Sequence, residues 1–124
     1  MTPTPPYYAV IFTSRRTSSA EDLYATTGAQ IYNLAVQQPG YLGIEAASES
    51  GQEITVSYWD SLENIKKWKI LADHVVAQKM GRSTFYEEYR VRIAKVEREY
   101  AWKRKTDEGL ADMSDDAEEH VGDR

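Results

Sequence analysis

The hydrophobic and polar positions in the first third of the chain predict a strand followed by a helix. Residues 7–14 are β-branched and aromatic, a composition that is typical of a strand. Within residues 23–35 the apolar positions recur at the spacing of one helix face, and the Gln-Pro-Gly sequence at residues 38–40 ends that helix. The chain therefore begins with a strand and an amphipathic helix.

The next two stretches predict a pair of strands joined by a tight turn. Residues 41–48 and residues 54–59 each alternate in side-chain character, which is the period of a strand. Ser50 and Gly51 between them are typical turn residues. We therefore expect the second and third strands to form an antiparallel hairpin.

The remaining pattern predicts a second helix and a fourth strand. Asp60, with Glu63 three residues later, is a typical helix cap. The apolar positions of residues 62–80 then follow helical spacing. Residues 89–96 alternate at first and then change face, which predicts a β-bulge or a change of pairing partner near Lys95.

The predicted order β-α-β-β-α-β is that of the split βαβ, or ferredoxin-like, α+β fold. Two helices can cover only one face of its four-stranded sheet. However, the first strand is apolar on both faces, and the third strand ends in Tyr58 and Trp59, which point to opposite faces. An apolar sheet face would be exposed in a single copy, so we expect a homodimer in which two open faces pack together as a dimeric α/β barrel.

Length and charge divide the chain into three regions. A chain of 124 residues suits one domain. Its formal charge of −5 comes from the C-terminal end, because residues 106–124 carry eight acidic residues against one arginine. We expect a flexible N-terminus at residues 1–6, one folded domain at residues 7–102, and an acidic, mobile tail at residues 103–124.

The composition excludes several classes of protein. The absence of cysteine excludes disulfide scaffolds, Cys-zinc sites and thiol nucleophiles. The folded region lacks the excess of Lys and Arg that neutralises phosphates, and no apolar run approaches the ~20 residues of a membrane helix. The start lacks the pattern of a signal peptide. We therefore expect a cytoplasmic protein with no nucleic-acid or membrane partner and no metal site.

One motif in the middle of the chain resembles a known family. Residues 56–68 combine a strand that ends in Trp59, a helix cap and a second tryptophan, Trp68. This arrangement is similar to that of the antibiotic biosynthesis monooxygenase family. The sequences of residues 38–41 and 85–89 also resemble those of the family. The family consists of dimeric α/β-barrel proteins and includes both cofactor-independent oxygenases and haem-degrading enzymes. The resemblance therefore implies the fold but leaves the activity open.

The resemblance implies three site residues on the second helix. Asn64 and Trp68 have the spacing of an Asn and a Trp that border the substrate in the cofactor-independent oxygenases, and residues four apart share a helix face. His74 stands where those oxygenases have a Tyr. It is the one histidine of the folded region and therefore the candidate general base.

Each of these three residues also has a purely structural interpretation. On an unbroken helix, His74 lies about 120° around the axis from Trp68, so that it is a surface residue unless the helix breaks near Asp73. Trp68 belongs to the apolar stripe and fits the core equally well. Asn64 fits a solvated position in the first helical turn.

Residues of the predicted strands complete the candidate site. Phe12, Tyr58 and Trp59 are candidate walls of an apolar pocket for a small hydrophobic aromatic ligand. Arg90, with Arg92 as its alternative, is the candidate to stabilise an enolate or peroxide anion, and one of the two is expected to face inward.

The haem-degrading branch of the family fits less well. Its enzymes carry an iron-ligating His about ten residues after the Trp, where this chain has Gln78, a poor iron ligand. The resemblance thus favours a monooxygenase without a cofactor that acts on an aromatic, polyphenol or quinone-like small molecule. The alternatives are a haem-binding or haem-degrading relative, and a dimer that binds a small ligand without catalysis.

Overall fold

The computed structural model describes residues 3–18, 21–79 and 85–105. The order of elements is the predicted β-α-β-β-α-β. The described residues form β1 (Tyr7–Arg16), α1 (Glu21–Ala35), β2 (Tyr41–Glu49), β3 (Gln52–Trp59), α2 (Leu62–Lys79) and β4 (Tyr86–Val96).

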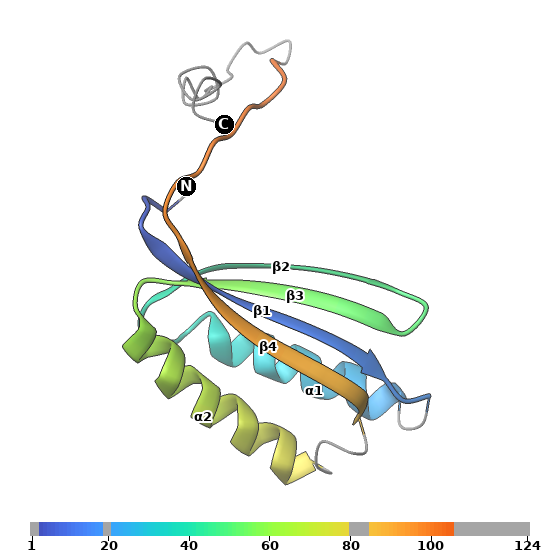
Figure 1. Ribbon diagram of the computed structural model, residues 1–124. Helices are drawn as coiled ribbons and strands as arrows, with labels where there is room; N and C mark the ends of the chain where they lie inside the picture. The colour runs from blue at the N-terminus through green and yellow to red at the C-terminus, as the bar shows by residue number, and fades with distance from the viewer. Residues whose placement is uncertain (1–2, 19–20, 80–84, 106–124) are drawn as a thin grey trace.

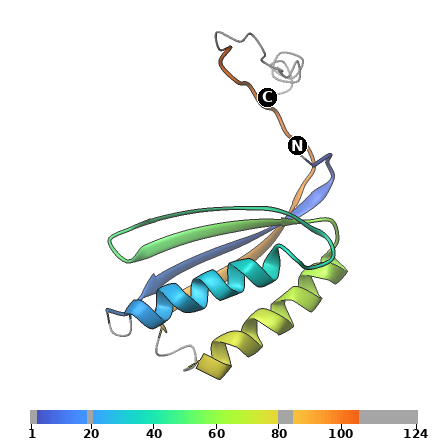
Figure 2. The same ribbon diagram turned by 180° about the vertical axis from the view of Figure 1, so that it is seen from behind.

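The four strands form one antiparallel sheet in the order β2-β3-β1-β4. Both helices lie on the same side of this sheet, and no helix of the described residues lies on the other side (Figures 1 and 2). The ferredoxin-like α+β fold predicted from the sequence is therefore confirmed. The start of β1 and the end of β4 lie at the same end of the sheet, and the chain leaves β4 there in an extended course (Figure 1).

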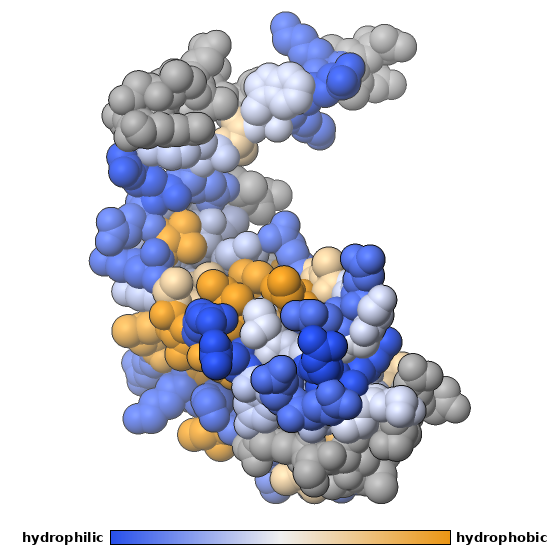
Figure 3. Space-filling model, turned by 45° about the vertical axis from the view of Figure 1, so that its right-hand side comes forward, coloured by the Kyte–Doolittle hydropathy of each residue, from blue (hydrophilic) through white to orange (hydrophobic). Residues whose placement is uncertain are grey.

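The register divides the apolar side chains of β1 between the two faces of the sheet. Val10 pairs with Ile93 of β4, and both face the helices. Ile11 pairs with Val56 of β3 and Arg92 of β4 on the opposite face, which no helix covers. In the space-filling view, apolar side chains gather in the middle of the body with charged side chains around them (Figure 3).

Two buried tryptophans join α2 to the sheet. Trp59 at the end of β3 is 0% exposed and Trp68 of α2 is 9% exposed. Their ring centroids are 5.8 Å apart and their planes differ by 23°, so the two indoles stack. Ala35 of α1 and Ile65 of α2 complete this buried cluster. Truncation of a tryptophan in such a cluster typically costs about 3–5 kcal/mol, so the stack is the main anchor of α2.

The predicted bulge near Lys95 is wrong. The pairing of β1 with β4 keeps one register through this residue, and its shift lies between Arg15 and Arg16 at the other end of β1. A second shift, between Tyr41 and Gly43, interrupts the pairing of β2 with β3. β4 also keeps β1 as its partner through this region, and Ala94 and Val96 lie on the uncovered face opposite Ala9 and Tyr7 of β1.

The cap of α2 also differs from its prediction. The backbone N–H of Asn64 donates a hydrogen bond to Ser61 Oγ at 3.1 Å, so that Ser61 rather than Asp60 is the N-cap. Asp60 instead accepts a hydrogen bond from the side-chain amide of Asn64 at 2.9 Å. Gly40, with a φ of 85°, lies directly against both of these side chains.

Two other sequence predictions concern the ends of the chain and its relation to membranes. Most of the predicted acidic tail lies beyond residue 105 and so outside the described residues. Its mobility stays a prediction. Within the described ranges, no helix combines the length and the apolar character needed to cross a membrane.

Gly40→Ala and Gly28→Ala are predicted to change stability in opposite directions. A Cβ at Gly40 would lie 2.5 Å from Asn64 Nδ2 on a backbone with φ of 85°, so we expect a loss of about 2 kcal/mol or more. A Cβ at Gly28 of α1 meets no atom within 4 Å, so we expect a gain of about 1 kcal/mol from helix propensity. Urea unfolding of both variants checks this, and a Gly40→Ala protein as stable as wild type would contradict it.

Candidate active site

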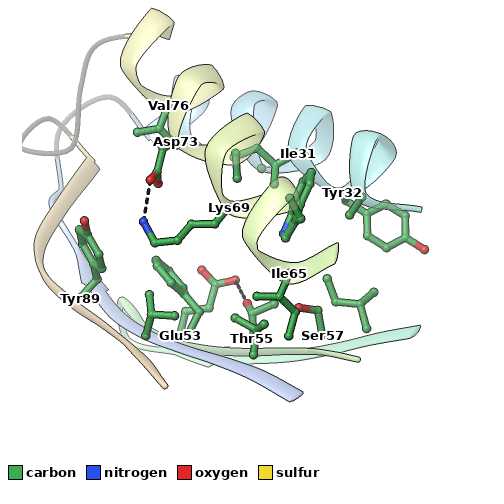
Figure 4. Close-up of a pocket in the computed structure, with 18 of the residues that line it drawn as sticks. Ile31, Tyr32, Glu53, Thr55, Ser57, Ile65, Lys69, Asp73, Val76 and Tyr89 are labelled. Atoms are coloured by element: carbon green, nitrogen blue, oxygen red, sulfur yellow. Dashed lines mark hydrogen bonds and ion pairs between the residues drawn. The ribbon is translucent and has the colours of Figure 1, made fainter. Parts of the chain in front are cut away.

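A pocket of about 270 Å³ lies between the helices and the helix-facing side of the sheet. Its floor comes from β1, β3 and β4 and its roof from α1 and α2 (Figure 4). Phe12, Thr55 and Val91 lie among the floor residues, and Ile31 and Trp68 among the roof residues. Most of this lining is apolar or aromatic, as is typical of sites for small organic molecules.

Aromatic rings form one end of the pocket, between β1, α1 and β4. Phe12 stacks with Tyr89 at a centroid distance of 5.5 Å and meets the edge of Tyr86 at the same distance of 5.5 Å. Tyr86 also lies 5.4 Å from Tyr89 and 6.0 Å from Tyr24 of α1. Because Phe12 contacts two rings of β4, β1 and β4 present one continuous aromatic surface to the pocket. We call Phe12, Tyr24, Tyr86 and Tyr89 the aromatic cluster.

A carboxylate lies among these rings. Glu53 of β3 lines the pocket, where its Oε1 accepts a short hydrogen bond from the hydroxyl of Tyr24. The hydroxyl of Thr55 donates a longer hydrogen bond to Glu53 Oε2 at 3.5 Å. Figure 4 shows Glu53 and Thr55 side by side on the floor of the pocket. Burial, followed by the hydrogen bond to Glu53, raises the pKa of Tyr24 above its ordinary value.

A second perturbed tyrosine lies beside this carboxylate. Burial is the largest influence on Tyr86, followed by the negative charge of Glu53, and together they raise its pKa to about 12. Tyr86 is therefore a neutral hydroxyl at pH 7. The aromatic cluster can thus supply hydroxyl groups for hydrogen bonding without adding charge to the pocket.

An ion pair of α2 lies at the edge of the pocket. Lys69 Nζ is 2.8 Å from Asp73 Oδ2, one helical turn away, and the two side chains are 58% and 41% exposed. Figure 4 shows this pair reaching from α2 toward the side of the pocket where Tyr89 lies. Such an exposed pair adds little stability, so its importance is the charge that it brings to the pocket's edge.

Three residues predicted for the site lie at the pocket or directly behind it. Phe12 and Trp68 line the pocket. Trp59 stacks behind Trp68, and its indole N–H donates a hydrogen bond to Ser57 Oγ at 2.9 Å. Trp68 is therefore both a residue of the buried core and a residue of the pocket wall.

The other two predicted residues of α2 lie away from the pocket. The helix is continuous from Leu62 to Lys79, so His74 is exposed on its outer side, in a shallow depression with Ile70 and Leu71. Asn64 lies in the first turn of α2 and is held by Asp60 and Ser61. The catalytic roles of His74 and Asn64 stay predictions, because neither side chain lines the pocket.

Of the predicted residues of β3 and β4, Tyr58 and both arginines point to the uncovered face of the sheet. Tyr58 donates a hydrogen bond to Glu45 of β2 at 2.8 Å and meets the ring of Tyr7 at 5.7 Å on that face. Arg90 pairs with Thr13, whose neighbour Phe12 lines the pocket, so Arg90 lies on the uncovered face too. Arg92 follows two positions later and shares this face, since side chains two apart on a strand point the same way. Neither arginine reaches the pocket.

Sequence reasoning missed Glu53, Tyr24 and Tyr86. A signal was available for Glu53, because the two-residue period of β3, counted back from buried Trp59, places it on the helix-facing side. Tyr24 lies one turn before Gly28 on the pocket side of α1. Tyr86 lies between the predicted second helix and the predicted fourth strand, in a segment that the sequence pattern assigned to neither. The described part of the chain contains no cluster of side chains suited to hold a metal ion.

Two curated proteins are similar to this chain in sequence. YqjZ of Bacillus subtilis, which has no assigned function, is 45% identical over 108 residues, or 86% of this chain and 94% of YqjZ. The jasmonate monooxygenase ABM of Pyricularia oryzae is 27% identical over 92 residues, or 72% of this chain and 43% of that protein. No protein-family model matches the chain.

Solved structures with the same fold have little sequence identity to the chain. SnoaB from Streptomyces nogalater, a cofactor-independent oxygenase, superposes with a TM-score of 0.55 at 7% identity, over 78% of this chain and 97% of SnoaB. A dimeric ferredoxin-like protein from Thermobifida fusca gives a TM-score of 0.56 at 10% identity, over 75% and 93%. A protein from Bordetella bronchiseptica assigned to the antibiotic biosynthesis monooxygenases gives 0.57 at 17%, over 72% and 95%.

The comparisons therefore identify the structural class of the fold. Its sheet and helices are those of the ferredoxin-like antibiotic biosynthesis monooxygenases, as the resemblance at residues 56–68 implies. By its sequence, the chain belongs to the same family as YqjZ of Bacillus subtilis.

Tyr86→Phe is predicted to make the protein less sensitive to alkaline pH. The pKa of Tyr86 in the folded protein, about 12, exceeds its ordinary value of 10.0, so its stabilisation is present below pH 10 and is lost as the pH rises toward 12. At pH 11 the loss is about 1 kcal/mol for a shift of this size. We expect the free energy of unfolding to fall less between pH 9 and pH 11 in the variant. Parallel pH curves for variant and wild type would contradict this.

Proposed function

We propose that the chain is a monooxygenase that needs no bound cofactor and acts on an aromatic, polyphenol or quinone-like small molecule. The observation that carries the proposal is the pocket between the sheet and the helices, whose lining is largely apolar and aromatic. The monooxygenase class of the similar proteins supports the reaction type. The nature of the lining supports the substrate class, because rings stack on rings and exclude water.

The volume of the pocket limits the size of the substrate. An engineered protein cavity of about 150 Å³ binds benzene, so a pocket of about 270 Å³ has room for one or two fused rings. Trp68 at one end and the aromatic cluster at the other offer flat surfaces to both faces of such a molecule. Larger polyketide-like ring systems would need to extend beyond the pocket.

For the proposed chemistry, the protein needs to supply only a pocket that excludes water and fits the substrate, and a group that accepts a proton. A hydroxylated aromatic substrate loses a proton, and the electron-rich anion reacts with O₂. In the net reaction a ring CH₂ becomes a carbonyl group, one oxygen atom of O₂ enters the product, and the other leaves as water with both hydrogens. The pocket would protect the anion from bulk water and position the ring carbon for O₂.

Haem chemistry has less support. Gln78, which stands at the position of the iron ligand in haem-degrading relatives, is exposed and lies outside the pocket lining. A titration with haemin that produced a Soret band at stoichiometric concentration would favour this alternative. Binding of aromatic ligands without oxygen uptake would favour the other alternative, a dimer that binds a small ligand without catalysis. We also propose that the protein is located in the cytoplasm.

Trp68→Phe is predicted to lower the rate of oxygen uptake at least tenfold with anthrone and hydroquinone substrates. The smaller ring leaves a gap in the pocket wall and loosens the stack on Trp59, so substrate positioning is lost. Trp102→Phe is the matched control, because Trp102 is 71% exposed and does not line the pocket. An oxygen electrode measures both rates, and equal rates in the two variants would contradict the role of Trp68.

The uncovered sheet face is proposed to pack against a second copy of the chain. Ile54 of β3 is 47% exposed on this face, and Ile11 and Val56 lie beside it. The dimeric ferredoxin-like protein from Thermobifida fusca supports this assembly for the fold. We therefore predict that light scattering finds two copies per particle at micromolar concentration, and that Val56→Asp, which puts a charge on this face, shifts the protein to one copy. A wild-type protein that is monomeric at this concentration would contradict the assembly.

A further inference from the structure

Glu53 is a half-buried carboxylate in a pocket whose lining is mostly apolar and aromatic. It projects from β3 on the helix-facing side of the sheet, among the residues that line the pocket (Figure 4). The hydroxyl of Tyr24 of α1 donates a hydrogen bond to it, and its negative charge contributes to the raised pKa of Tyr86 of β4. Partial burial of a carboxylate costs free energy unless hydrogen bonds replace the hydration that it loses, so the contacts of Glu53 are informative.

The hydrogen bonds to Glu53 leave it able to accept another. The hydroxyl of Tyr24 donates to one carboxylate oxygen, and the hydroxyl of Thr55 donates to the other at 3.5 Å, the long end of hydrogen-bond distances. An ionised carboxylate has about four acceptor positions. A donor from a ligand in the pocket can therefore replace the weak bond from Thr55 or use a free position.

The other charged groups near the pocket have partners of their own. Lys69 of α2 pairs with Asp73. Arg16 of β1 lies over the ring of Tyr24, 5.2 Å from the ring centroid. In the described part of the chain, no ion pair involves Glu53. Its hydrogen-bonding partners are therefore hydroxyl groups, and a ligand hydroxyl is the same chemical type.

We propose that Glu53 is the acceptor that selects hydroxylated aromatic molecules and takes their proton. This rests on the proposed function and names the substrate group that the pocket recognises. In the proton transfer, the O–H bond of the aromatic hydroxyl breaks and the proton moves to a carboxylate oxygen of Glu53. The electron pair stays on the aromatic oxygen, which becomes the anion that reacts with O₂. The hydroxyl of Tyr24 donates to the same carboxylate, so it competes with the hydroxyl of a ligand.

The test compares two probes that differ only in this hydroxyl. Calorimetric titration of the full chain at pH 7 measures the affinity for 2-naphthol and for its methyl ether, 2-methoxynaphthalene. A site built to receive a hydroxyl discriminates strongly against an analogue that lacks it, so we expect wild type to prefer 2-naphthol by about tenfold or more. In Glu53→Gln the preference falls below about threefold, because bonds to a charged acceptor are roughly twice as strong as neutral ones.

Two further variants serve as controls. Glu45→Gln alters the equivalent tyrosine–carboxylate pair on the uncovered face, where Tyr58 donates to Glu45 at 2.8 Å, and it keeps the wild-type preference. Tyr24→Phe removes the donor that competes for Glu53 and raises the preference for 2-naphthol. This variant keeps the proposal testable even when Glu53→Gln fails to fold, which its circular dichroism spectrum reveals.

The outcomes separate this inference from the proposed function. Equal affinity of wild type for the two probes, an unchanged preference in Glu53→Gln, or a preference that falls equally in Glu45→Gln would overturn the role of Glu53 and leave the pocket in place. A preference that does not rise in Tyr24→Phe would overturn it too. Failure of both probes to bind would overturn the pocket and Glu53 together. Selective binding of 2-naphthol with no oxygen uptake from any substrate would support Glu53 and refute the monooxygenase.

Discussion

The stacking of Trp68 on Trp59 is the contact on which the site depends. It fastens the first half of α2 to the end of β3, so it sets the distance between the helix layer and the sheet. The rest of the space under α2 contains the pocket, between this stack and the aromatic cluster. Loss of the stack would therefore change both the stability of the domain and the shape of the cavity.

The two faces of the sheet carry the same kinds of residue but are proposed to have different functions. Each face carries a tyrosine that donates a hydrogen bond to a glutamate, Tyr24 to Glu53 on the helix side and Tyr58 to Glu45 on the uncovered side. The first pair lies in a pocket of about 270 Å³, where low polarity strengthens its electrostatic effect. The second pair lies on a face proposed to meet another subunit. Position relative to the helices, and not residue type, therefore separates candidate chemistry from candidate assembly.

The elements were predictable from the sequence because their signals are local. A two-residue or helical period, a turn pair and a Gln-Pro-Gly stop each act within a few positions, and the structure places all six elements where these signals lie. The candidate site was predicted only in part. Trp68 and Phe12 belong to recognisable patterns, whereas Glu53 meets Tyr24 across 29 residues of chain, which no local period encodes. The position of His74 followed from helix geometry once α2 was known to be unbroken.

The central claim is that the space between α2 and the sheet binds aromatic molecules. Nuclear Overhauser effects between bound 2-naphthol and assigned side chains of the protein test this claim most directly. The account predicts contacts from the naphthol ring to the ring protons of Trp68 and Phe12, on opposite walls of the pocket. Contacts only to exposed residues such as Trp102, or to side chains of the uncovered face such as Tyr58, would contradict it.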